Sequence, residues 1–177
     1  MHPIEIQSAL DNMTLLLDSR EQKTAALQKR LNAIGLPYER TALKSGDYSC
    51  KTVLPDGREW SLADKLAIER KMSADELAGN FTRGRERFTR EFDRFVGEGG
   101  KIYLLVENTD YPHIIGHKYR SLFNPEAYLA SLFAWQARYG VVPVFCPADV
   151  SGLLIRKILH YEMRERLERG DADDLGG

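Results

Sequence analysis

Residues 102–108, IYLLVEN, are the part of the sequence that most constrains the fold. They form a continuous apolar run with β-branched residues and without glycine or proline, a pattern typical of a strand covered on both faces. A second short strand, VVPVFCP at 141–147, follows a helical pattern at 124–140 and precedes another at 150–167. Helices that alternate with buried strands predict an α/β domain with a mixed central β-sheet flanked by helices.

The N-terminal part of the chain adds strands that end on charged residues. We expect a strand at 13–21, a helix at 22–35, a strand at 37–43, a hairpin from 46 whose return strand ends at 71, and one long helix at about 74–96. The first strand delivers Asp18, Arg20 and Glu21 at its C-terminal end. The return strand ends on Glu69, Arg70 and Lys71, instead of on a glycine, asparagine or proline turn.

Length and composition indicate a single-domain protein that is neither membrane-spanning nor secreted. The 177 residues predict a single domain at 13–169, with an N-terminal extension at 1–12 and a disordered acidic tail at 170–177. No apolar run is long enough to span a membrane, and the N-terminus lacks the pattern of a secretory signal. Cys50 and Cys146 have no zinc-type spacing, so we expect reduced thiols. We therefore expect a protein that is not secreted: cytoplasmic in a bacterium or virus, or nuclear in a eukaryote.

The net charge of −1 argues against a histone-like, wholly electrostatic DNA binder. It leaves a DNA enzyme open, because binding depends on where the charges lie. Trp60 is either a residue that stacks on bases or an aromatic that packs in the hairpin, and packing is the favoured interpretation.

Four carboxylates fall at strand ends or beside a strand start: Asp18, Glu21, Asp47 and Glu69. Hydrolysis of phosphodiesters with Mg²⁺ or Mn²⁺ needs hard oxygen ligands, and a nearby lysine such as Lys71 can stabilise the charge that develops. Glu69 and Lys71 lie on the same face of their strand because strand side chains alternate. In a chain with 29% charged residues this triplet arises often by chance, so taken alone it is weak and a strand-end salt bridge is the favoured explanation.

Three motifs together change that balance. The sequence resembles the nuclease domain of the XPF family of structure-specific endonucleases, which includes the Mus-type members. The resemblance rests on Gly46-Asp47, on Glu69-Arg70-Lys71 followed after three residues by Asp75, and on the upstream Asp18-Ser19-Arg20-Glu21. The resemblance covers about residues 13–162. It implies a restriction-endonuclease-like core and a divalent-metal-dependent endodeoxyribonuclease, a hydrolase acting in DNA repair or recombination.

The resemblance also assigns roles. Asp47 and Glu69 would be the main metal ligands, with Asp18 and Glu21 completing the acidic cluster around Mg²⁺ or Mn²⁺. Lys71 would position water or stabilise charge, and Arg70 would contact phosphate or brace the site. Asp75 is either functional or a helix-start acid favoured by the helix dipole. Arg20 is assigned to DNA contact.

Residues 81–95 carry a local arginine pattern. Arg83, Arg87, Arg90 and Arg94 recur at spacings of 4, 3 and 4, which predicts one helix face, and phenylalanines gather opposite them as core packing. The arginines are either a solvated face or a phosphate-binding surface. Their position after the Glu-Arg-Lys motif favours DNA contact, and the predicted contact residues are Arg83, Arg85, Arg87 and Arg90. Gly84 and Arg85 match a Gly-Arg pair that many family members have here. Many members also have a glutamine five residues after that glycine, where this chain has Thr89.

Two departures from the family pattern bear on partners. The gap between Asp47 and Glu69 holds 21 residues, and no helix-hairpin-helix sequence follows the nuclease region. We therefore expect specificity to come from homodimerisation through the late helices, from a partner nuclease subunit, or from loose substrate choice. The expected substrate is branched, flap or single-strand/duplex junction DNA. The alternatives are a catalytically inactive DNA-binding or dimerisation partner, and a nuclease of the same core acting in restriction or mismatch cleavage.

Overall fold

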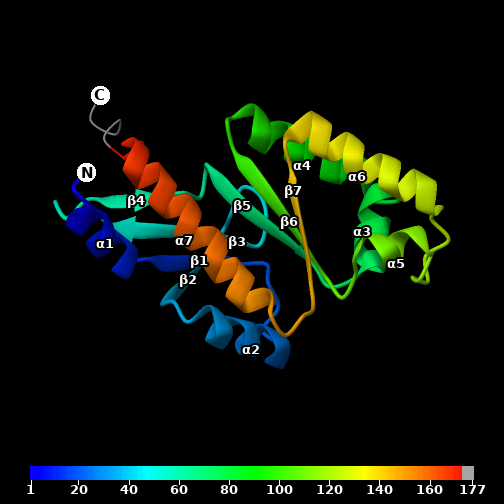
Figure 1. Ribbon diagram of the computed structural model, residues 1–177, viewed down its shortest axis with the longest axis horizontal. Helices are drawn as coiled ribbons and strands as arrows, with labels where there is room; N and C mark the ends of the chain where they lie inside the picture. The colour runs from blue at the N-terminus through cyan, green and yellow to red at the C-terminus, as the bar shows by residue number, and fades with distance from the viewer. Residues whose placement is uncertain (173–177) are drawn as a thin grey trace. The chain divides into compact units, whose positions relative to one another are not determined.

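The computed structural model describes residues 1–172 and shows an α/β fold (Figure 1). Its helices are α1 (Pro3–Asp11), α2 (Ala25–Ile34), α3 (Ala74–Phe81), α4 (Arg85–Gly97), α5 (Tyr111–Ile115), α6 (Pro125–Tyr139) and α7 (Ser151–Arg169). Its strands are β1 (Thr14–Asp18), β2 (Tyr38–Thr41), β3 (Tyr48–Val53), β4 (Glu59–Ser61), β5 (Leu66–Lys71), β6 (Lys101–Glu107) and β7 (Val142–Cys146). No helix among these residues is long and apolar enough to cross a membrane.

The chain divides into two compact units. Unit 1 comprises Met1–Leu43, Tyr48–Ala63 and the described residues from Gly152 onward, and unit 2 comprises Lys44–Asp47 and Asp64–Ser151. The predicted α/β class with mixed strand pairing is confirmed, because β1 pairs in parallel with β2 and antiparallel with β3.

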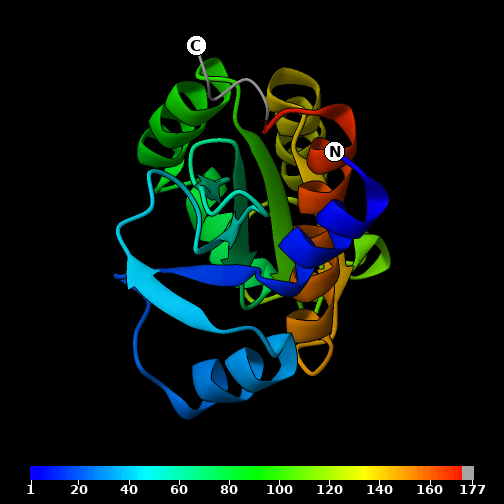
Figure 2. The ribbon, with the colours of Figure 1, turned by 90° about the vertical axis from the view of Figure 1, so that its left-hand side faces the viewer.

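Unit 1 contains a four-stranded sheet in the order β2-β1-β3-β4, with β4 antiparallel to β3. Figure 2 shows β1 and β2 lying side by side. Helix α1 falls in the predicted extension and buries Ile6, Ala9 and Leu10, and the Thr52 hydroxyl donates a hydrogen bond to the carbonyl of Ala9. Trp60 is buried in β4, so its interpretation as a packing residue is confirmed.

Unit 2 contains three parallel strands, β5-β6-β7, which place Glu69 beside Leu104 and Lys71 beside Val106. Strand β6 is the central one, and most of its side chains are buried, as its apolar run predicts. Helices α3, α4 and α6 cover it with an aromatic core in which the rings of Phe88 and Trp135 stack at 4.7 Å. The predicted phenylalanine packing is confirmed, since Phe81, Phe88, Phe92 and Phe95 are all buried.

The single helix predicted at 74–96 is wrong. Thr82 follows α3 as its C-cap with a non-helical backbone (φ −113°, ψ −98°), and Gly84 is the N-cap of α4. The Thr82 hydroxyl donates to the carbonyl of Ala78. Arg83 therefore lies in the turn between two helices and does not share a helix face with Arg87 and Arg90.

Smaller differences concern the return strand of the hairpin and a helix that was not predicted. The predicted return strand of the hairpin is two strands, β4 and β5, separated by residues 62–65, and the five-residue α5 was not predicted. Helix α6 buries Tyr128, Leu132, Trp135 and Tyr139, whereas Phe133 on the same helix is 52% exposed. The predicted tail is described only to Ala172, which is buried, and its residues 173–177 lie outside the described residues.

Candidate active site

Strand β5 delivers two oppositely charged side chains to one face. Glu69 and Lys71 are separated by one residue and so point the same way, while Arg70 points to the other face. The Lys71 Nζ donates to the Glu69 Oε1 at 2.5 Å, and both side chains are largely buried, with exposed fractions of 9% and 12%. The predicted pairing of these two groups on one face is therefore present as a direct contact.

Burial governs the electrostatics of this pair. It raises the pKa of the Glu69 carboxyl, Lys71 opposes that rise, and the nearby charges of Glu91 and Glu76 add to it. Burial alone would lower the pKa of Lys71, but attraction to Glu69 and Asp47 outweighs it, and the pKa of this amine lies above its ordinary value. Lys71 therefore keeps its proton, and Glu69 lies where a further positive charge would be favourable.

The Gly46-Asp47 motif is held against β5 by two hydrogen bonds on either side of Glu69. The backbone N–H of Asp47 donates to the carbonyl of Ile68 at 2.9 Å, and the N–H of Arg70 donates to the Asp47 Oδ2 at 2.7 Å. Gly46 has φ +74°, and a Cβ there would lie 2.9 Å from the carbonyl oxygen of Ile68. The glycine therefore permits a close approach that puts the Asp47 carboxylate at the strand end.

Arg70 braces the strand on its other face. Its guanidinium donates two hydrogen bonds to Glu107, whose side chain is only 2% exposed. This bidentate pair ties the end of β5 to the end of β6. Of the two predicted roles for Arg70, the structure therefore supports the brace. Sequence reasoning missed Glu107, although a carboxylate that ends the apolar run of β6 was a visible signal.

Asp75 lies in the first turn of α3, after the N-cap Ser73. Its Oδ1 accepts a hydrogen bond from the backbone N–H of Ser121 at 2.6 Å, and its Oδ2 lies 3.8 Å from the Arg120 Nε. Neighbouring Glu76 accepts from the N–H of Met72, just after Lys71. Asp75 thus holds the segment before α6 through contacts with Arg120 and Ser121, in addition to its position in the first turn of α3.

The upstream Asp-x-Arg-Glu motif forms its own network in unit 1. The buried Asp18 carboxylate accepts hydrogen bonds from the N–H groups of Arg20 and Leu43 and from the Arg20 guanidinium. Although burial alone would raise it, these donors hold the pKa of Asp18 below its ordinary value. Arg40 donates to the carbonyl of Glu21 at 2.8 Å. Asp18 therefore organises the turn after β1, and metal binding by Asp18 and Glu21 stays a prediction.

The donor set of unit 2 fits a divalent metal. Among residues 1–172, no group of three or more histidine, cysteine, aspartate or glutamate side chains is arranged to hold an ion. Asp47 and Glu69 nevertheless offer two carboxylates from one strand end, and Mg²⁺ commonly uses one or two carboxylates with water and substrate phosphate. The partly uncompensated burial of Glu69 favours a cation there.

The predicted DNA-contacting arginines differ in their contacts. Arg87 and Arg90 are exposed on α4, where Arg90 lies 4.0 Å from Glu86. Arg85 donates to the carbonyl of Phe81 and to the Ser131 hydroxyl, which holds the turn between α3 and α4. The Arg20 side chain is 67% exposed although it pairs with Asp18. DNA contact stays a prediction for all of them.

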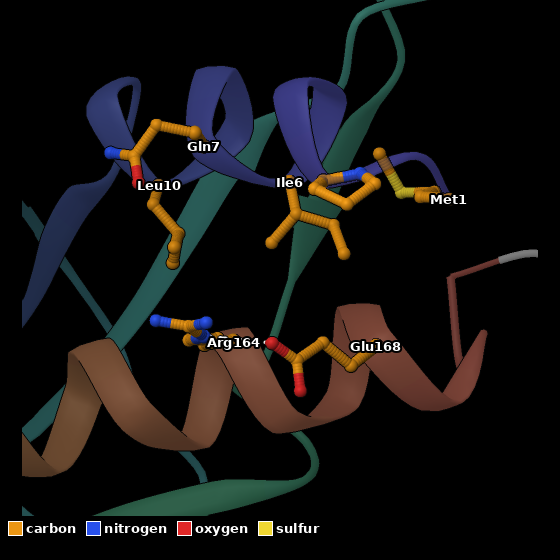
Figure 3. A pocket seen from close by; sticks show the side chains of 7 residues that line it. Met1, Ile6, Gln7, Leu10, Arg164 and Glu168 are labelled. Carbon is orange, nitrogen blue, oxygen red and sulfur yellow. Dashed lines mark hydrogen bonds and ion pairs between the residues drawn. The ribbon is translucent and has the colours of Figure 1, made fainter.

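A cavity of about 260 Å³ lies in unit 1 between α1 and α7 (Figure 3). Ile6 and Leu10 line it from α1, and Arg164 and Glu168 extend toward it from α7. None of the motif residues lines this cavity, so it is separate from the candidate active site.

Comparison with known families places the motif residues in context. The family model described as the ERCC4 domain matches residues 17–149, which run from β1 to the end of the loop after β7. The chain belongs to the ERCC4 domain family. The family match confirms the resemblance that the Gly-Asp and Glu-Arg-Lys motifs of this ERCC4 domain indicated. No sequence among the curated proteins matches the chain.

Two solved structures resemble this ERCC4 domain. XPF from Aeropyrum pernix has a TM-score of 0.60 at 20% identity, over 84% of this chain and 61% of that chain. XPF from the same organism in complex with DNA has a TM-score of 0.61 at 20% identity, over 87% of this chain and 66% of that one. The likeness confirms the predicted α/β fold, a mixed β-sheet flanked by helices, and the chain spans less than two thirds of either neighbour.

Proposed function

We propose that this ERCC4 domain is a divalent-metal-dependent DNA endonuclease that cuts branched, flap or junction DNA. The observation that carries the proposal is the pair of hydrogen bonds, one from the Asp47 N–H to the carbonyl of Ile68 and one from the Arg70 N–H to the Asp47 carboxylate, that holds Asp47 at the end of the strand with Glu69 and Lys71. Two carboxylates that can bind a divalent metal and a protonated lysine beside them suit metal-assisted phosphodiester hydrolysis. The family match supports endonuclease activity. The neighbouring XPF structure in complex with DNA supports DNA as the substrate.

Asp47 and Glu69 would hold Mg²⁺ or Mn²⁺ through their carboxylate oxygens. When bound, such an ion lowers the pKa of a water and polarises the phosphate. The protonated Lys71 donates toward the phosphate oxygens and stabilises the negative charge that they gain. Arg70 does not need to touch DNA for this chemistry, because its pair with Glu107 keeps the strand end in place.

We also propose that this domain forms a homodimer. Tyr111, Ile115 and Phe133 form an apolar surface on α5 and α6: the rings of Tyr111 and Phe133 stack at 5.8 Å, and Ile115 is 60% exposed. Strand β7 forms one edge of the unit 2 sheet, and four of its five residues are half-buried. A second copy that covers this α5–α6 surface would remove it from water.

Cleavage assays test the nuclease. Labelled flap, fork, junction and linear duplex DNA are incubated with the wild type in Mg²⁺, Mn²⁺ or EDTA, beside Asp47→Asn and Lys71→Ala. We expect metal-dependent cutting of branched DNA and a loss of about 100-fold or more in each variant. The controls are Asp64→Asn and Lys157→Ala, two exposed positions outside the site.

The outcomes separate the parts of the proposal. Absence of metal-dependent cutting on every substrate overturns the enzyme. Cutting that survives Asp47→Asn overturns the site. Equal cutting of branched and linear DNA overturns the substrate class alone.

A further inference from the structure

A groove of about 660 Å³ lies on unit 2 beside Asp75. Gly79 of α3, with Thr82 and Arg83 just after it, forms one side, and residues 120–123 form the other. Its volume falls in the range of about 300–1,000 Å³ found for ligand sites. We call it the α3 groove.

The loop on one side of the α3 groove is fixed by hydrogen bonds. Besides the bond from Ser121 to Asp75, the Tyr119 hydroxyl donates to the carbonyl of Phe123 at 2.6 Å. A His117 ring nitrogen lies 2.8 Å from the carbonyl oxygen of Ser121, and the Phe123 side chain packs against the aromatic core. Leu122, between two anchored residues, is 95% exposed. The loop therefore holds an apolar side chain in water at a defined position.

The charges of the groove favour an anion. Arg83 and Arg120 face it with one carboxylate, Asp75, which already accepts a backbone hydrogen bond. The Arg120 side chain is 97% exposed and lies 3.8 Å from Asp75, so its guanidinium can reach a ligand. Guanidinium groups bind phosphate, and an apolar side chain beside them suits a base, which is the combination that nucleic acid presents.

We propose that the α3 groove holds the unpaired strand of a branched DNA. Arg83 and Arg120 bind its phosphates, and Leu122 packs against the bases at the branch point and unstacks them. Asp75, which lines the groove, follows Lys71 by four residues and lies in the same unit as the candidate active site. This inference rests on the proposed function for the choice of DNA, and it assigns branch recognition to three residues outside the motifs.

Binding measured in EDTA tests the groove separately from cleavage. The probe is a forked DNA with 2-aminopurine at the branch, beside a linear duplex of matched sequence. We expect the wild type to raise the 2-aminopurine fluorescence, and Leu122→Ala to abolish most of that rise and to weaken fork binding about tenfold relative to the duplex. Leu153→Ala, an exposed leucine on α7, is the matched control.

The arginines are tested by salt dependence. The double variant Arg83→Gln/Arg120→Gln should flatten the slope of log affinity against log salt on the fork by about 1.4, or 0.7 for each phosphate on a single strand. The control is Lys29→Gln/Lys157→Gln, which removes two exposed charges elsewhere. Thermal unfolding of each variant establishes that the fold is kept.

Each result bears on one proposal or the other. Unchanged fluorescence and fork preference in Leu122→Ala, or an unchanged slope in the arginine variant, overturns the groove even if the protein cuts DNA. Fork binding that depends on Leu122 in a protein that cuts nothing retains the groove and overturns the nuclease. A wild type that binds neither DNA overturns both.

Discussion

Glu107 accepts two hydrogen bonds from the Arg70 guanidinium, 2.8 Å from Nε and 2.7 Å from Nη2. Glu107→Ala leaves a largely buried guanidinium without this partner, and we expect it to lower the free energy of unfolding by about 3–5 kcal/mol in urea titrations. Glu98→Ala, which removes an exposed ion pair with Lys44, should cost under about 1 kcal/mol.

A double variant tests the cause of that loss. Arg70→Met/Glu107→Met removes both charges and should regain at least half of the stability lost in Glu107→Ala, because no buried charge is left alone. A Glu107→Ala protein as stable as Glu98→Ala would contradict the brace.

Gly46→Ala should displace Asp47 without changing any charge. The new methyl meets the carbonyl oxygen of Ile68 at 2.9 Å, whereas Gly57, with φ +86°, has nothing within 4 Å of an added Cβ. Gly57→Ala therefore loses only the stability that a positive φ costs an alanine. Gly46→Ala should be less stable than Gly57→Ala by about 1–3 kcal/mol, and it should cut DNA far more slowly. Thermal unfolding and cleavage rates measure both effects, and equal behaviour of the two variants would refute the steric role of Gly46.

The stability of unit 1 should depend on the ionisation of Asp18. Its pKa in the folded protein lies below the ordinary value of 3.8, so its carboxylate stabilises the fold above that pH and loses this contribution as the pH falls through the folded pKa. Asp18→Asn should therefore cost most at neutral pH, about 1.5–3 kcal/mol, mainly through the backbone donors. Urea titrations of wild type and variant between pH 3 and pH 7 should converge toward acid, and a difference independent of pH would contradict this origin.

Arg87 and Arg90 of α4 should contribute phosphate contacts to duplex DNA. Replacing both with glutamine should reduce the slope of log affinity against log salt by about 1.8, or 0.9 for each contact on B-DNA. Anisotropy titrations of a linear duplex at several salt concentrations measure it, with Lys29→Gln/Lys157→Gln as the control. An unchanged slope would show that Arg87 and Arg90 make no phosphate contacts and only form a solvent-exposed helix face.

The α5–α6 apolar surface should be a dimer contact. Phe133→Glu places a charge on that surface and should convert the dimer to a monomer in light scattering at micromolar concentration. Ile4→Glu alters a 74%-exposed residue on α1 and should leave the mass unchanged. A wild-type protein that is monomeric at those concentrations would exclude the homodimer.

Local patterns predicted the parts of the site that depend on local rules. Alternation along β5 was enough to put Glu69 and Lys71 together, and the apolar run of β6 was enough to identify a central strand. The break at Thr82 was missed because the residues around it keep helical spacing, while at the break the Thr82 backbone leaves the helical region and the N–H of Gly84 donates to the carbonyl of Gly79, five residues back.

The rest of the site depends on contacts between distant residues. Arg70 and Glu107 are 37 residues apart, Asp18 and Leu43 are 25 apart, and Asp75 and Ser121 are 46 apart. No periodicity links such positions, because the pairing is set by how strands and loops come together. Four side chains of α6, Tyr128, Leu132, Trp135 and Tyr139, belong to the aromatic core, and Phe133 lies outside it.

The path of the chain limits how this protein can be divided. Residues 44–47 belong to unit 2, yet unit 1 residues precede and follow them, and the remainder of unit 2 starts only at Asp64. A fragment cut at 64–151 would keep the strand with Glu69 and Lys71 and would lose Asp47. A protease that nicks the segment between Asp47 and Asp64 would separate the two carboxylates covalently, so activity after such a nick would report whether the halves stay associated.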